Sequence, residues 1–264
     1  MTIEPKDLRL SVSKTKTFID CKKKFKFCYV EKLPRKEWDY HVFGKFAHKV
    51  LEDFHQDYLN GCSDPYHVNM TKCFKAAQVE YGASMTPQMT KDVFALIKEY
   101  LKIITLDKQH NLAANILSVE KNFEMKVGDH LVLNGMIDRI QLDPDGVIHV
   151  ADYKTTKNKK YLVNDFFQLL TYAYVILSEN PDIDKVRASY ILLRHDFEYI
   201  TKDFTVAEIM AIEEKYLKYA ETINAEQEYP ANPTALCSYC DYLEVCPEGK
   251  SKSFGKPVYG EVAW

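Results

Sequence analysis

The sequence predicts an α/β protein with a mixed sheet core flanked by helices, an N-terminal helical part and a cysteine-rich C-terminal segment. Three observations support this. Apolar residues recur at helical spacing within residues 1–110, β-branched and apolar segments separated by turns dominate 111–228, and three closely spaced cysteines lie within 229–248. We therefore expect one domain over 1–248, followed by a polar tail over 249–264.

Four helices are predicted in the N-terminal part. Ser11 or Ser13 can cap the first, which we expect to reach about Glu31 and to stop before Pro34. The other three are predicted over 42–59, 69–84 and 88–107. Apolar stripes at helical spacing in the first and last of these three predict that each buries one face.

The pattern changes at about residue 116. Segments rich in β-branched and apolar residues are separated by Gly128-Asp129 and by Asp143-Pro144-Asp145-Gly146, which are turn sequences, so we predict an antiparallel three-stranded meander. Strands are expected over 116–127, 130–142, 147–155, 186–194 and 197–204. A helix over 164–178 separates the meander from the last two strands, and a long helix over about 206–226 follows them.

Composition excludes several classes of protein. Of the 264 residues, 46% are hydrophobic and 28% are charged, with 9 Gly and 10 Pro, so the chain is not disordered, collagenous or of low complexity. No apolar run reaches the roughly 18 to 20 residues of a membrane span. The N-terminus also lacks an apolar signal segment, so we expect a cytoplasmic protein without a membrane partner.

Basic residues are concentrated near the N-terminus. The whole chain has a formal charge of −3, yet residues 1–50 hold 13 Lys or Arg against 6 Asp or Glu. One lysine cluster here and a second in mid-chain are candidates for contact with nucleic acid. They contain Lys22, Lys23, Lys24, Lys26, Lys154, Lys157, Lys159 and Lys160. Charge alone is explained equally well by solvated basic faces.

Two acidic residues and a lysine lie on adjacent predicted strands. Residues two apart on a strand share a face, so Asp152 and Lys154 point the same way and Tyr153 points opposite. The intervening turn can bring Asp138 near Asp152, and a divalent cation such as Mg²⁺ or Mn²⁺ usually relieves the repulsion between two carboxylates. A lysine beside such a site indicates phosphodiester hydrolysis, although the triplet alone is more often an exposed strand end.

Two predicted helices carry polar pairs four residues apart, which places both members of a pair on one helix face. His48 and Glu52 form one pair, and Gln168 and Tyr172 form the other. Each pair taken alone is ordinary helix surface.

Together these segments resemble a known superfamily. Gly44-Lys45-Phe46-Ala47-His48, Gly135-Met136-Ile137-Asp138, Asp152-Tyr153-Lys154 and Gln168-Leu169-Leu170-Thr171-Tyr172 match, in order and spacing, the PD-(D/E)XK nucleases. The RecB-like branch, which includes CRISPR-associated RecB-like exonucleases, is the most similar, and the resemblance spans about residues 8–248. It implies a restriction-endonuclease-like fold. Ile137 replaces the usual Pro and Asp152 the commoner Glu, and both departures are familiar in this branch.

The resemblance implies four ligands for Mg²⁺ or Mn²⁺, three from side chains and one from the backbone. These are His48, Asp138, Asp152 and the carbonyl of Tyr153. Lys154 would be the catalytic lysine, with Gln168 and Tyr172 contacting the DNA backbone or ordering the site. Glu52 would support the ligands without binding the metal.

Cys237, Cys240 and Cys246 form a compact triplet that lacks a fourth ligand. In the RecB-like branch a cysteine of the first helix joins such a triplet to hold a [4Fe-4S] cluster, and the resemblance gives this place to Cys21. Cys28 competes for it, because it lies seven residues further on at roughly the same helix face. Zinc is the alternative occupant, since four thiolates also suit tetrahedral Zn²⁺.

The resemblance predicts a metal-dependent deoxyribonuclease, expected to act as an exonuclease on single-stranded or frayed DNA in recombination, replication or DNA processing. No helicase motif is present, so unwinding would need a helicase, recombination or CRISPR-type partner protein in a bacterial, archaeal or phage-infected cell. The alternatives are an endonuclease of the same fold, a nuclease-fold subunit that only binds DNA or assembles with other proteins, and an iron–sulfur redox protein. The last would leave the carboxylates and the lysine without a role. The sequence leaves the oligomeric state open.

Overall fold

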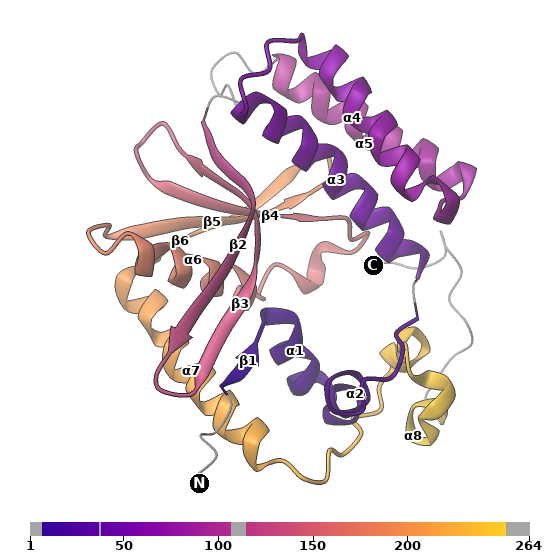
Figure 1. Cartoon of the computed structure of the whole chain (residues 1–264), viewed down its shortest axis with the longest axis vertical. Coiled ribbons are helices and arrows are strands. Elements are labelled where there is room, and N and C mark those ends of the chain that lie inside the picture. Colours follow the sequence, from indigo (N-terminus) through magenta and orange to yellow (C-terminus); the bar gives the residue numbers. More distant parts are fainter. Residues whose placement is uncertain (1–6, 37, 107–114, 252–264) are drawn as a thin grey trace, which may run out of the picture. The chain divides into compact units, whose positions relative to one another are not determined.

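The computed structural model describes residues 7–36, 38–106 and 115–251 (Figure 1). Residue contacts divide the chain into two compact units. The terminal unit gathers the segment up to Trp38, Phe123–Gly135 and the segment from Ala211 onward, and the central unit gathers Asp39–Asn122 and Met136–Met210. None of the helices in the described ranges combines the length and the apolar character that a membrane crossing requires.

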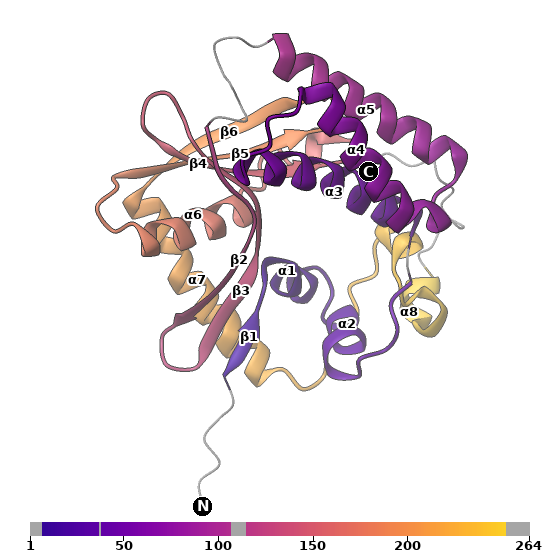
Figure 2. The same cartoon turned by 45° about the horizontal axis from the view of Figure 1, so that its top comes forward.

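Three long helices of the central unit pack against one another (Figure 2). They are α3 (Asp39–Leu59), α4 (Tyr66–Tyr81) and α5 (Pro87–Leu106). All three were predicted, and their observed ends differ from the predicted ends by no more than three residues. The apolar stripe of α3 is buried, and Val50, Leu51 and Phe54 have no exposed surface. Helical spacing predicts these helices well because burial of one face stabilises each of them.

The strands form a six-stranded mixed sheet in the order β1-β3-β4-β5-β6, with β2 pairing β3. Their bounds are β1 Leu8–Leu10, β2 Ile116–Val127, β3 Leu131–Leu142, β4 Ile148–Lys154, β5 Lys185–Leu192 and β6 Glu198–Thr205. The β1–β3 and β4–β5 pairs are parallel, and the β3–β4 and β5–β6 pairs are antiparallel. The predicted meander and final hairpin are confirmed. Strand β1 was not predicted, because three residues are too few to show an alternating pattern.

Helix α6 (Phe167–Glu179) connects the parallel strands β4 and β5 and packs on both. Adjacent parallel strands need such a crossover connection, because a tight turn would make the second strand antiparallel to the first. Its residues from Leu169 to Leu177 are buried except Leu170, which anchors the helix firmly. The first turn of α6 is thereby held close to the end of β4.

The terminal unit corrects one prediction. Instead of one helix from Ser11 or Ser13 to Glu31, the chain forms α1 (Val12–Asp20), α2 (Lys22–Phe25) and a π-helical turn over Lys26–Val30. The break falls at Cys21, whose backbone is extended and whose sulfur accepts a hydrogen bond from the N–H of Lys24. Cys21 therefore ends one helix and caps the next, which the apolar spacing on either side cannot show.

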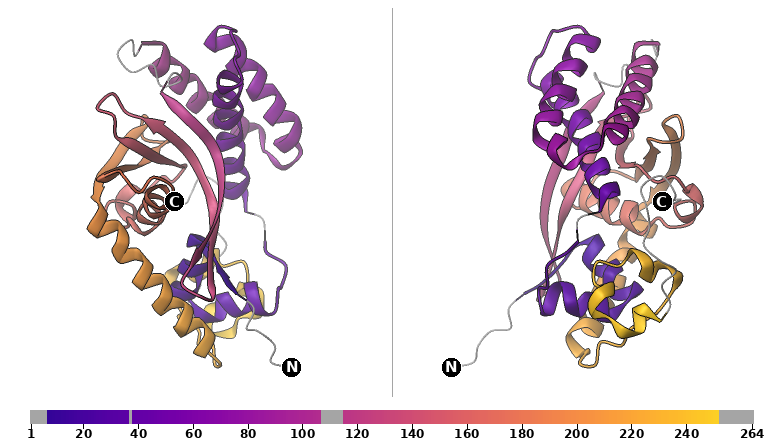
Figure 3. Two further views of the ribbon diagram at one scale, coloured as in Figure 1. Left: turned by 60° about the vertical axis from the view of Figure 1, so that its left-hand side comes forward. Right: turned by 90° about the vertical axis from the view of Figure 1, so that its right-hand side faces the viewer.

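The long helix α7 (Val206–Ala225) is confirmed, and most of it belongs to the terminal unit. After it, the chain makes short turns and the four-residue helix α8 (Pro247–Lys250), drawn in yellow in Figure 3. Residues 249 and 250 of the expected polar tail end this helix, and 252–264 lie outside the described residues. The α/β class with a mixed sheet flanked by helices is confirmed.

Candidate active site

The predicted acidic residues lie where two strands of the central unit separate. The ladder between β3 and β4 runs from Leu142↔Ile148 to Arg139↔Ala151 and ends there. One residue beyond, Asp138 Oδ2 accepts a hydrogen bond from the backbone N–H of Tyr153 at 2.8 Å. A carboxylate thus replaces the backbone carbonyl that the ladder would have supplied. This place, where the β3–β4 ladder ends, is called the strand fork below.

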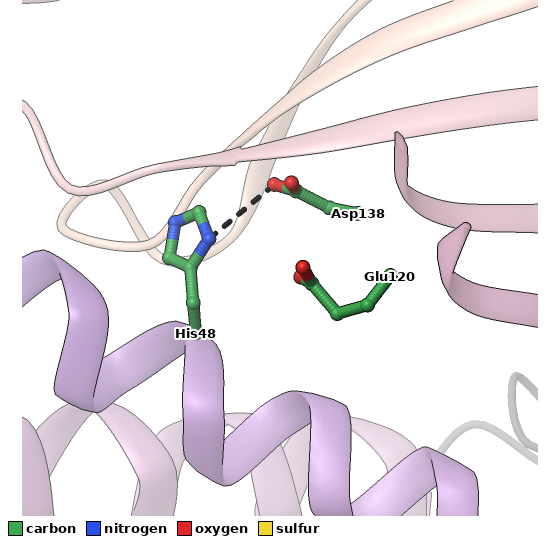
Figure 4. Close-up of side chains that lie close together, drawn as sticks. All are labelled: His48, Glu120 and Asp138. Atoms are coloured by element: carbon green, nitrogen blue, oxygen red, sulfur yellow. Dashed lines mark ion pairs between the residues drawn. The ribbon is translucent and has the colours of Figure 1, made fainter. Parts of the chain in front are cut away.

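His48, Glu120 and Asp138 offer one ligand atom each, and these atoms lie within 4.8 Å of one another (Figure 4). His48 Nδ1 is 3.4 Å from Asp138 Oδ2. The three side chains come from α3, β2 and β3, so three separate elements converge. An imidazole with two carboxylates is a donor set that suits Mn²⁺ or Mg²⁺. The structure therefore brings His48 and Asp138 together as predicted and adds a third donor.

Glu120 was not among the predicted site residues. Its φ of +45° is in the left-handed region, which costs a non-glycine residue about 1 to 2 kcal/mol. The buried residues Val119, Phe123 and Val127 lie on one face of the strand on both sides of this position, so the alternation of burial does not mark it. Such strain is often found at functional sites. No pattern of apolar residues in the sequence marks Glu120 as a site residue.

The pKa values of two acidic groups are raised because the groups are buried close to other carboxylates. Burial, reinforced by the negative charge of Asp152, raises the pKa of Asp138 to about 6, although His48 and Lys154 oppose the rise. Burial also raises the pKa of Glu120 to about 8, with repulsion from Asp138, Glu52 and Asp152 adding to it. A cation at this place would relieve both effects. The residues present therefore fit a divalent metal ion.

A hydrogen-bonded group on β4 and α6 lies beside the acidic residues. Lys154 Nζ is 2.6 Å from Asp152 Oδ2 and donates to Gln168 Oε1 at 2.8 Å. Gln168 Nε2 donates to Asp152 Oδ1 at 2.7 Å and to the hydroxyl of Tyr172 at 2.8 Å. Asp152 is 2% exposed, so its charge is balanced mainly inside this group. The structure thus joins four of the predicted residues.

Helix α3 approaches the end of β4 closely. A Cβ on Gly44 would lie 3.4 Å from Thr155 Oγ1, the residue after Lys154. The backbone of α3 therefore lies close to the residue that follows β4. Glu52 of the same helix is not in the three-donor group and pairs with Lys49 at 3.3 Å. The supporting role of Glu52 stays a prediction.

Several lysines predicted to contact nucleic acid are already paired with acidic residues. Lys22 and Lys23 pair with Glu226 and Glu248 within the terminal unit. The remaining pairs are Lys26 with Glu31 and Lys159 with Glu198. Lys24 forms no ion pair within the described ranges, and Lys157 has an interaction of its own. A lysine that already pairs with a carboxylate must lose this ion pair to bind a phosphate. We therefore expect these lysines to contribute only modestly to the free energy of DNA binding.

Three cysteines of the terminal unit have a common local setting. The sulfurs of Cys21, Cys237 and Cys246 each accept a hydrogen bond from the backbone N–H three residues away in sequence, at 3.3 to 3.5 Å. Burial raises the pKa of the Cys240 thiol, and the charge of Cys21 adds to this rise. Cys28 differs, because its sulfur accepts from Arg35 Nη2 at 2.6 Å.

Comparison with known proteins identifies the family. A model described as the PD-(D/E)XK nuclease superfamily matches residues 9–247. The chain belongs to this superfamily. The residues predicted from the resemblance, Asp138, Asp152 and Lys154, lie on its strands β3 and β4. Membership supports a nuclease.

Two curated relatives of this PD-(D/E)XK nuclease are the B subunits of the ATP-dependent helicase/deoxyribonuclease from Streptococcus pyogenes serotype M1 and from serotype M49 strain NZ131. Each is 24% identical over 209 residues, which cover 72% of this chain and 18% of the relative. The chain therefore matches less than a fifth of the length of these relatives.

A solved structure has the same fold. It is a protein provisionally assigned as an exonuclease, from Eubacterium rectale, with a TM-score of 0.55 and 11% identity over 95% of this chain and 90% of that one. At this identity the likeness concerns the fold alone. The predicted nuclease fold is thereby confirmed.

Proposed function

We propose that the chain is a metal-dependent deoxyribonuclease whose residues 1–248 act as one nuclease domain. The observation that carries the proposal is the convergence of His48, Glu120 and Asp138 next to the linked residues Asp152 and Lys154. Asp152 and the carbonyl of Tyr153 would complete the set of ligands for Mg²⁺ or Mn²⁺. When bound, such an ion supplies positive charge that offsets the carboxylates and polarises a phosphodiester.

The side chains around this place have separable roles. Lys154 Nζ, held between Asp152 and Gln168, would orient the attacking water and stabilise charge on the phosphate. Gln168 would fix the positions of the carboxylate of Asp152 and the ammonium of Lys154 relative to each other. Tyr172, on the next turn of α6, would hold Gln168 in place. Because Asp152 is almost fully buried, this arrangement persists without substrate.

We expect an exonuclease that acts on single-stranded or frayed DNA in recombination, replication or DNA processing. The curated relatives carry the names of both a helicase and a deoxyribonuclease, which favours a helicase as the partner that would supply unwound DNA. An endonuclease, or a subunit that binds DNA without cutting it, are the competing proposals.

One cleavage experiment separates these proposals. Purified protein is incubated with end-labelled linear single- and double-stranded DNA and with circular single-stranded DNA, with Mg²⁺ or Mn²⁺ and then with EDTA. We expect digestion of the linear single strand that stops in EDTA. Cleavage of the circle would indicate an endonuclease. Binding of DNA without cleavage under any of these conditions would overturn the proposal in favour of a binding subunit.

For the cysteines we propose a [4Fe-4S] cluster held by Cys21, Cys237, Cys240 and Cys246. Backbone N–H groups directed at sulfur are typical of cluster sites, where such hydrogen bonds stabilise thiolate charge. Zinc is the competing occupant, since four thiolates also suit tetrahedral Zn²⁺.

Cys21 is favoured over Cys28 as the fourth ligand. The charges of Cys21 and Cys246 both act on Lys23, and that of Cys21 acts on Cys240. Cys28 is instead bound to Arg35. A brown protein absorbing near about 400 nm would support a cluster, and a colourless protein containing stoichiometric zinc would overturn it.

A further inference from the structure

Among the residues that the structure describes, Arg139 is the largest side chain that is fully buried. It follows Asp138 directly on β3, so its side chain points to the opposite face of the sheet. Among the described residues no carboxylate lies within ion-pair distance of it, and its Nε has no hydrogen-bond partner. Burying a guanidinium without a counter-charge costs roughly several kcal/mol of folding free energy. Such a group needs a role that offsets this cost.

One of the two hydrogen bonds of Arg139 crosses the strand fork. Nη1 donates to the hydroxyl of Tyr153 on β4 at 3.3 Å, and Nη2 donates to Gln141 on its own strand. Arg139 is also the last residue of the β3–β4 ladder. Its side chain therefore joins the two strands at the point where the backbone ladder stops doing so.

Tyr153 connects this contact to two of the proposed metal ligands. Its backbone N–H donates to Asp138 Oδ2 at 2.8 Å. Its ring lies edge-on against the ring of His48, with the centroids 5.8 Å apart. The same hydroxyl interacts with Tyr100, whose own hydroxyl is 2.6 Å from His55 Nε2. A change in the position of Tyr153 would therefore move His48 and Asp138 together.

We infer that Arg139 is a positioning residue, which holds Tyr153 across the fork so that His48 and Asp138 keep the spacing of a metal site. The inference rests on the proposed function, because it assumes that these residues bind a divalent cation. Hydrogen-bonded partners behind metal ligands commonly change metal affinity by 10- to 100-fold when they are removed.

The test measures Mn²⁺ binding by calorimetry on the full chain without DNA, together with thermal unfolding and cleavage. Arg139→Met should lower Mn²⁺ affinity by about tenfold, with a Tm no lower than that of the unsubstituted protein, because replacing a buried ion by an apolar side chain is often neutral or stabilising. Arg139→Lys should restore part of the affinity, since one ammonium can still reach the hydroxyl of Tyr153.

Tyr153→Phe removes only the acceptor and keeps the proposal testable if Arg139→Met does not fold. It should lower Mn²⁺ affinity nearly as much, and combining it with Arg139→Met should add little further loss, because both remove the same contact. Tyr216→Phe is the matched control, since it removes a hydroxyl from a buried tyrosine of the terminal unit. Its Mn²⁺ affinity should be unchanged.

Unchanged Mn²⁺ affinity in folded Arg139→Met and Tyr153→Phe would overturn the inference, as would losses that add fully in the double variant. Failure of the proposed function has a different signature. In that case the unsubstituted protein would not bind Mn²⁺, or Asp138→Ala would bind it equally well.

Discussion

The carboxylate site and the cysteine segment differ in how the fold holds them. The carboxylate site is built on long helices and strands of the central unit, and its side chains are linked by hydrogen bonds between distant segments. In the stretch 229–251, only Ser238, Tyr242 and Gly249 are buried. Its sulfurs are capped by neighbouring backbone N–H groups.

This difference indicates two ways of making a binding site. Regular elements that bury apolar surface can hold repelling carboxylates close together before any ligand binds. Short turns with little core of their own depend on the bound group, because the free energy of binding then becomes free energy of folding. We expect the first site to tolerate loss of its metal and the second to lose its order.

The largest expected effect concerns cleavage. Lys154→Ala and Asp152→Ala should each lower the cleavage rate by about 10³-fold, because Lys154 stabilises charge on the phosphate and Asp152 helps to hold the metal ion. Both variants should still unfold cooperatively, since the surrounding elements keep their apolar core. End-labelled linear DNA with Mn²⁺ provides the assay.

Lys159→Ala is the matched control for this comparison. Lys159 pairs with Glu198 on the surface, so this variant should cleave at close to the rate of the unsubstituted protein. Equal losses in Lys154→Ala and Lys159→Ala would mean that positive charge in general, rather than the position of Lys154, supports activity. Cleavage that survives both Lys154→Ala and Asp152→Ala would place the site elsewhere.

The next effect concerns the cysteine segment. Cys21→Ser should abolish absorbance near about 400 nm and lower Tm by roughly 10 °C, since loss of about 3 kcal/mol moves Tm of a protein this size by that amount. Cys28→Ser should keep both, because its sulfur is bound to Arg35. Absorbance and calorimetry of anaerobically purified protein measure the two quantities. Retention of colour by Cys21→Ser and its loss in Cys28→Ser would reverse the ligand assignment.

Sequence and structure agree most closely where periodicity reports burial. Helix α3 and strands β2 to β6 were predicted because each buries one face or lies inside the sheet. The break at Cys21 was not, since a capping sulfur leaves no trace in apolar spacing. Glu120 was not, because a left-handed backbone conformation at one residue does not alter the apolar pattern of its strand. Arg139 could not be found either, because an arginine after a strand carboxylate is normally solvated.

A smaller effect tests whether the fold alone holds the carboxylates together. The folded pKa values of Asp138 and Glu120, about 6 and about 8, exceed their ordinary values of 3.8 and 4.5. Between these limits the folded metal-free protein binds more protons than the unfolded chain, so its stability is fully present below about pH 4 and falls as pH rises toward 8. Thermal unfolding in EDTA should show this fall.

In Glu120→Gln, the loss of stability between about pH 6 and 8 should become smaller. The loss of stability that is due to Asp138 should remain. We expect Tm in EDTA at pH 8 to rise by about 2 to 4 °C, which corresponds to roughly 1 kcal/mol. The rise is small because solvent screens the partly exposed carboxylate of Glu120. Mn²⁺ at about 100 times its Kd should add about 2.7 kcal/mol to the unsubstituted protein and less to the variant. The same pH slope in both proteins would show that Glu120 is not strained by its neighbours.

The smallest effect concerns the lysines next to Cys21, and it asks whether the terminal unit takes part in DNA binding at all. Lys22 pairs with Glu226, so Lys22→Ala should lower affinity for single-stranded DNA by less than about twofold, as a surface ion pair contributes roughly 0 to 1 kcal/mol. Lys24 forms no ion pair within the described ranges, so Lys24→Ala should have the larger effect and should reduce the slope of log K against log salt by about 0.7, the value for one contact to a single strand. Fluorescence anisotropy at several salt concentrations measures both quantities. If the slope stays the same in Lys24→Ala, this lysine does not contact DNA. DNA binding would then depend on the central unit.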